Sequence, residues 1–86
     1  MAKPAAKEAE IFGEALKRWR KKRGLSQDRL SKSAGIGSSY LSHVERGEQV
    51  PSLTIVLKLA YALEVLPADL LSDFTPSTMK RLGFNK

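Results

Sequence analysis

The sequence contains no cysteine among its 86 residues. This absence excludes disulfide bridges, zinc sites built on thiolates and thiol nucleophiles. There is a single histidine and no second soft ligand for a metal ion, so we expect neither a metal nor a cofactor. No apolar run reaches the length of a membrane span, and the N-terminus lacks a secretory apolar segment. We therefore expect a cytoplasmic protein that has no membrane partner.

Acidic residues are scarce beside basic ones, 9 against 15, which gives a net charge of +6. Residues 17–23, KRWRKKR, are basic at every position except Trp19. Such a run predicts attraction to a polyanion. The alternative is an amphipathic helix lying on a membrane surface. We expect instead that the apolar stripe between Ile11 and Trp19 packs in the core.

The hydrophobic pattern predicts one small all-α domain, with no strand pattern and no internal repeat. Without a disulfide or a metal, tight helix packing or a partner chain has to supply its stability. We expect residues 1–7 to form a flexible arm, 8–72 the domain, and 73–86 a tail that is a candidate for dimer contact. Five short helices are expected, at residues 8–22, 27–33, 38–45, 53–63 and 68–71.

Helical spacing also predicts which side chains face inward. They are Ile11, Ala15 and Trp19, flanked by Phe12 and Leu16, in the first helix, Leu30 and Ala34 in the second, Leu41 and Val44 in the third, and Leu53, Val56, Leu57, Ala60 and Leu63 in the fourth. Ser26 and Ser52 are expected to cap helices. Gly24 and Gly35 are expected to adopt a left-handed backbone conformation.

Residues 26–47, SQDRLSKSAGIGSSYLSHVERG, have the layout of two short helices joined by a tight turn at Gly35. In a helix-turn-helix, the second helix lies in the major groove of DNA and the first crosses the backbone above it. The side chains expected to face outward from the second helix can form hydrogen bonds: Ser38, Ser39, Ser42 and His43. The pattern therefore predicts a protein that binds double-stranded DNA.

This segment, with the preceding GL and the following PSLTIVLKLAYAL, resembles the Xre/Cro-type, lambda-repressor-like helix-turn-helix domains of bacterial and phage regulators. The resemblance extends over residues 12–71. It implies a five-helix lambda-repressor-like fold with the helix-turn-helix at the second and third helices. It also implies a transcriptional regulator, such as a repressor, that binds a palindromic operator as a homodimer.

The resemblance assigns roles to single residues. Base contacts are expected from Ser38, Ser39, Tyr40 and His43, and phosphate contacts from Lys22, Arg23, Gln27, Ser42 and Arg46. Arg20 and Glu45 match a pair that forms a buried or half-buried salt bridge in this family. Because serine hydroxyls read bases permissively, specificity is expected to depend on His43, Tyr40 or DNA shape.

Two departures from the family pattern follow the fourth helix. Glu64 replaces the usual glycine, which predicts a different turn, and Leu66 replaces the usual polar cap. An apolar residue at that cap is expected to be exposed and to face a partner chain. We therefore expect dimer contacts at Leu66, Leu70 and Phe74.

Other functions have weaker support in the sequence. A Ser-His-Asp hydrolase would need a nucleophile elbow, and the two glycines of Gly35-Ile36-Gly37 follow no strand, so no enzyme is expected. Two alternatives remain open. One is a protein-interaction module, such as the antitoxin-like partner of another protein. The other is a restriction–modification controller, as the specific kind of regulator.

Overall fold

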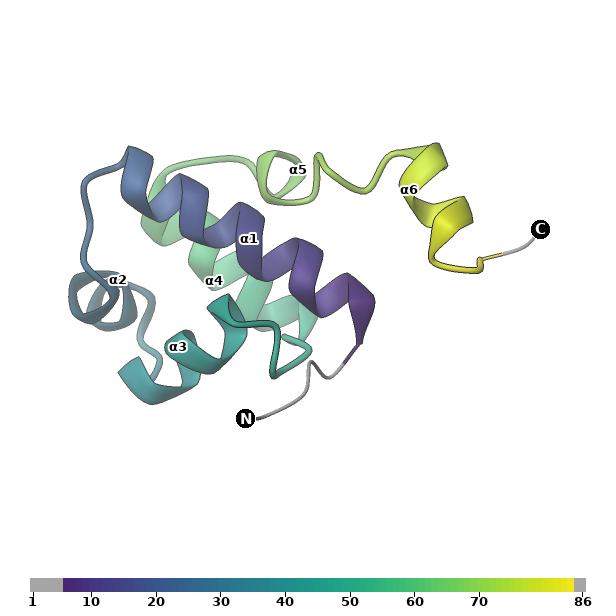
Figure 1. The fold of residues 1–86 in the computed structure, drawn as a ribbon. Helices are drawn as coiled ribbons and strands as arrows, with labels where there is room; N and C mark the ends of the chain where they lie inside the picture. Colours follow the sequence, from purple (N-terminus) through teal and green to yellow (C-terminus); the bar gives the residue numbers. More distant parts are fainter. Residues whose placement is uncertain (1–5, 85–86) are drawn as a thin grey trace.

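The computed structural model describes residues 6–84, and every regular element in this range is a helix. The helices are α1 Lys7–Lys22, α2 Gln27–Ala34, α3 Ser38–Glu45, α4 Leu53–Leu63, α5 Pro67–Leu70 and α6 Pro76–Arg81 (Figure 1). The all-α fold is confirmed, with six helices in place of the five predicted. Most of the predicted N-terminal arm, residues 1–5, lies outside the described residues.

Short polar side chains begin three of these helices. The hydroxyl of Ser26 accepts from the backbone N–H of Arg29 at 3.1 Å, and Ser52 does the same for Ile55 at 3.2 Å. Thr75 caps α6, the helix that the sequence did not predict, and Pro76 occupies its first position. Because α6 buries none of its residues, the apolar pattern contained no signal for it.

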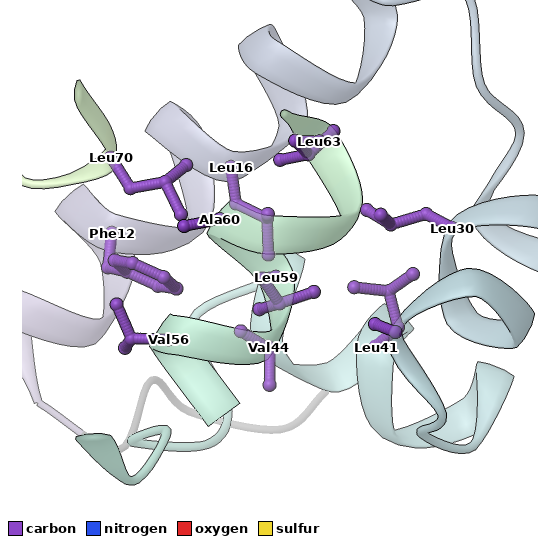
Figure 2. Packing of buried hydrophobic residues seen from close by; sticks show 11 residues of the cluster. Phe12, Leu16, Leu30, Leu41, Val44, Val56, Leu59, Ala60, Leu63 and Leu70 are labelled. Carbon is purple, nitrogen blue, oxygen red and sulfur yellow. The ribbon is translucent and has the colours of Figure 1, made fainter. Parts of the chain in front are cut away.

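The core lies between α1 and α4 and is closed by α2, α3 and α5 (Figure 2). Its largest fully buried side chains are Leu16, Leu30, Leu41, Val44, Leu59, Leu63 and Leu70. α1 crosses α3 closely at Gly13, where an added Cβ would lie 2.5 Å from the carbonyl oxygen of Val44. The two helices can pack this closely only because Gly13 has no side chain.

The buried face of α1 differs from the predicted stripe. Phe12, Ala15 and Leu16 are buried, whereas Ile11 and Trp19 are half-buried at its edge. The indole nitrogen of Trp19 donates to the carbonyl oxygen of Asp69 at 3.3 Å. Trp19 therefore packs against the core and also ties α1 to α5.

The predicted inward stripe of α4 is wrong at two positions. Leu53 and Leu57 are 71% and 46% exposed, and Leu59 is fully buried instead. The sequence of α4, LTIVLKLAYAL, is apolar around most of its circumference. Its periodicity therefore could not choose the inward face, which is set by packing against α2 and α5.

The turn after α4 corrects two further predictions. Glu64 takes the left-handed conformation, with φ of 59°, so the glycine-type turn is retained although a side chain is present. Leu70 is fully buried in the protomer's own core, because α5 packs against both α1 and α4. It is unavailable to a partner chain, and the predicted dimer contact at Leu70 is wrong. Leu66 is 67% exposed, as predicted.

Candidate nucleic-acid interface

The α2–turn–α3 unit presents one surface of α3 to solvent. α2 ends at Gly35, whose φ of 70° turns the chain sharply, and α3 begins at Ser38. The side chains of α3 that point inward are Leu41, Val44 and Glu45. At about 100° per residue, Ser39, His43 and Arg46 fall on the opposite side, and Ser42 lies beside them. These four side chains are exposed or half-buried.

Two other residues predicted to contact bases lie at the margins of this surface. Ser38 is exposed in the first turn of α3. Tyr40 is half-buried and packs against the hydrophobic core. The structure thus brings Ser39, Ser42, His43 and Arg46 together, and the base and phosphate contacts themselves remain predictions.

A buried ion pair fixes the other side of α3. The guanidinium of Arg20 donates to both carboxylate oxygens of Glu45, at 2.6 and 3.0 Å, and to the carbonyl oxygen of Leu25 at 2.9 Å. The side chains of Arg20 and Glu45 are 11% and 2% exposed. A bidentate pair fixes orientation as well as distance. It therefore sets how α3 sits against α1.

Gln27 joins this network. Its side-chain amide donates to Glu45 at 3.0 Å, which links the first turn of α2 to the last turn of α3. The phosphate contact predicted for Gln27 thus concerns a side chain that already has a structural partner. The resemblance assigned Gln27 to phosphate, and no spacing rule connects it to a carboxylate 18 positions away.

Two arginines of the basic run bond to residues that flank α5. Arg18 pairs with Asp73, and Arg23 donates to the carbonyl oxygen of Glu64 at 2.9 Å. The ammonium of Lys22 lies 4.9 Å from the centre of the Trp19 ring. In Figure 1, α2 lies between the C-terminal end of α1 and α3. Lys22 ends α1 and Arg23 follows it, whereas Arg46 directly follows α3. The phosphate contacts expected of all three remain predictions.

A small polar cluster closes the end of α3. Nδ1 of His43 lies 2.6 Å from Oε1 of Glu48, and Nη2 of Arg46 lies 3.3 Å from the same oxygen. Glu48 lies between the predicted third and fourth helices, and neither the pattern nor the resemblance assigns it a role. The available signal was its position directly after the glycine that ends α3.

Comparisons with known proteins agree with this geometry. A family model described as a helix-turn-helix domain matches residues 11–74. The chain belongs to the helix-turn-helix family. It is 38% identical over 58 residues to YazB, an HTH-type transcriptional regulator of Bacillus subtilis, a match that covers 67% of this chain and 84% of YazB. The resemblance to Xre/Cro-type regulators is thereby confirmed.

Two further relatives show how this helix-turn-helix protein compares in length. It is 36% identical over 64 residues to the transcriptional regulator SinR of Bacillus subtilis, which covers 73% of this chain and 58% of SinR. The crystal structure of the restriction-modification controller protein C.AhdI of Aeromonas hydrophila superposes with a TM-score of 0.72 at 41% identity. That superposition covers 73% of this chain and 96% of C.AhdI.

No helix among residues 6–84 has the length and apolar content needed to cross a membrane.

Proposed function

We propose that this helix-turn-helix protein binds a specific double-stranded DNA sequence and regulates transcription from it. The observation that carries the proposal is the division of α3 into two faces. The inner face is fixed by the Arg20–Glu45 pair, and the outer face offers Ser39, His43 and Arg46. A helix held rigidly, with hydrogen-bonding groups directed outward, suits readout of base edges in the major groove. This function is DNA binding rather than catalysis. It would take place in the cytoplasm, where a bacterial regulator binds its DNA.

The proposal includes a homodimer on a palindromic operator. One recognition helix reads only a few base pairs, and dimers of this motif place two of them about 34 Å apart. The exposed face of α4 supplies a surface for the second copy: Leu53, Leu57 and Tyr61 recur at four-residue steps and are 71%, 46% and 87% exposed. An uncharged apolar stripe is complementary to itself, as a two-fold interface requires. Leu66, 67% exposed, lies just beyond the end of α4.

Selection from a pool of random DNA duplexes tests the function. We expect enrichment of a palindrome whose half-sites are about one helical turn apart. His43→Ala should lose the preference at one base position in each half-site and keep its affinity for unrelated DNA. Ser77→Ala, on the exposed surface of α6, is the control and should reproduce the wild-type motif. A pool that shows no enrichment would contradict sequence-specific binding.

The match to C.AhdI favours one specific kind of regulator. This chain is 41% identical to it and covers 96% of its length. A restriction–modification controller is therefore the second candidate. An enriched operator lying upstream of a restriction endonuclease gene would support it, whereas an operator found only at unrelated promoters would contradict it.

A further inference from the structure

Glu48 is held in a fixed place relative to His43 by the backbone that ends α3. The N–H of Glu48 donates to the carbonyl oxygen of His43 at 2.9 Å, and the N–H of Gly47 donates to Val44 at 3.0 Å. These two bonds form the Schellman motif, which requires a left-handed residue at Gly47, whose φ is 75°. An added Cβ at Gly47 would also lie 2.9 Å from Cα of Glu10. The turn is therefore constrained by its conformation and by its neighbour.

In this position, the side chain of Glu48 binds one edge of the imidazole ring of His43. Its carboxylate oxygen lies 2.6 Å from Nδ1 of His43, and its side chain is only 15% exposed. A carboxylate can only accept, so Nδ1 carries the proton of this bond. Arg46 lies 3.3 Å from both Nδ1 and the carboxylate oxygen. Because Arg46 and Nδ1–H are both donors, the partner of Arg46 is the carboxylate.

The opposite edge of the ring remains available. Within residues 6–84, both side-chain hydrogen bonds of His43 involve Nδ1. In the same range, no buried side-chain nitrogen or oxygen lacks a hydrogen-bond partner. Nε2 therefore has no hydrogen-bond partner among these residues and is not fully buried, on a side chain that is 46% exposed. In a neutral ring, protonation at Nδ1 leaves Nε2 with a lone pair, so it can accept a hydrogen bond.

We propose that Glu48 is a positioning residue for DNA readout, which orients His43 and selects the tautomer whose Nε2 accepts from an exocyclic amino group of a base. In the major groove these amino groups are N6 of adenine and N4 of cytosine. The inference rests on the proposed DNA-binding function, because it assigns the chemistry that His43 would read. Glu48 itself contacts no base. Its negative charge would oppose phosphates, so its presence beside a reading helix is explained by its effect on His43.

The tautomer can be tested in the free protein without DNA. The chain has one histidine, so the imidazole ¹⁵N resonances belong to His43 without ambiguity. At pH 8.5, we expect the Nδ1–H form in the wild type and in Glu48→Gln, whose amide oxygen still accepts. Glu48→Ala should shift the ring toward the Nε2–H form. An Nε2–H ring in the wild type would overturn the inference and leave the proposed function intact.

Base preference tests the consequence for readout. At one position per half-site, Glu48→Ala should reduce the preference for adenine or cytosine about three- to tenfold, the loss expected for one hydrogen bond. His43→Ala should lose the same preference, and the double variant should lose no more than either single one. Glu48→Gln should keep the preference while binding all DNA more tightly, because it removes a negative charge. Gln49→Ala, at the exposed neighbouring position, is the control and should match the wild type.

The failure of the inference differs from the failure of the function. A wild-type motif retained by Glu48→Ala but lost by His43→Ala would show that His43 reads DNA without Glu48. A preference for guanine at the His43 position would mean that Nε2 donates, and it would also overturn the assigned tautomer. If the wild type enriches no sequence, the proposed function fails, and the inference fails with it.

Discussion

Among residues 6–84, Arg20 and Glu45 are the only charged residues that are buried. Taking two charges out of water is costly, and here the cost is offset by two short bonds between them and by further bonds to Leu25 and Gln27. Removing one partner leaves an uncompensated charge in the interior. The pair therefore contributes to stability only while it is complete.

We expect Arg20→Ala to lower the free energy of unfolding by about 3–5 kcal/mol, because Glu45 would stay buried without its partner. Urea unfolding followed by circular dichroism measures this. Arg18→Ala removes an ion pair whose partners are 59% and 41% exposed, and it should cost less than about 1 kcal/mol. Equal losses from the two variants would contradict the buried role of Arg20.

The sequence and the family resemblance predicted some side-chain hydrogen-bond partners and missed others. The resemblance paired Arg20 with Glu45, and the structure contains that pair. It assigned Gln27 to phosphate and gave Glu48 no role, although both bond to side chains of α3. Each of these contacts depends on where a turn places the residue, and helical spacing says nothing across a turn.

The helices show the same limit. In α1 and α3, polar and apolar residues alternate strongly enough to indicate the buried side, although the exact edge in α1 was misjudged at Ile11 and Trp19. In α4, apolar residues surround the helix, so only the neighbours decide that Leu59 is buried and Leu57 is exposed. α6 buries nothing, and Thr75-Pro76 at its start was its only signal.

The exposed face of α4 leads to a prediction about assembly. We expect Leu57→Asp to weaken homodimerisation about a hundredfold or more, because a two-fold interface contains this residue twice and each burial contributes about 1.5 kcal/mol or more. Sedimentation equilibrium over a range of concentrations measures the dissociation constant. Met79 of α6 is 37% exposed, so Met79→Asp is the matched control and should dimerise normally. A dimer unaffected by Leu57→Asp would place the interface elsewhere.

Over the whole molecule, a net charge of +6 favours association with DNA, but the structure distributes that charge unevenly. Much of the basic run is engaged with Asp73, Glu45 and the end of α4. Composition predicts the attraction to a polyanion. It could not predict that cations adjacent in sequence to the helix-turn-helix would hold α1 to other helices.

The dependence of DNA binding on salt should therefore be carried by a small number of cations. Arg46→Ala should weaken binding to all sequences about equally and reduce the slope of log K against log salt by about one per bound protomer. Arg18→Ala should leave the slope nearly unchanged, because Arg18 pairs with Asp73 just beyond α5. Figure 1 shows α5 and α3 on opposite sides of α1. Fluorescence anisotropy at several salt concentrations measures both. A change confined to one base position in Arg46→Ala would contradict its phosphate role.

The close crossing of α1 and α3 at Gly13 leaves the recognition helix little freedom to tilt within its protomer. In a dimer built from such protomers, the protein would fix the separation of the two reading helices. Any misfit would then be taken up by the double helix, which bends or overtwists at a cost set by its own sequence. Base pairs between the half-sites, although touched by no side chain, would then be selected for their stiffness.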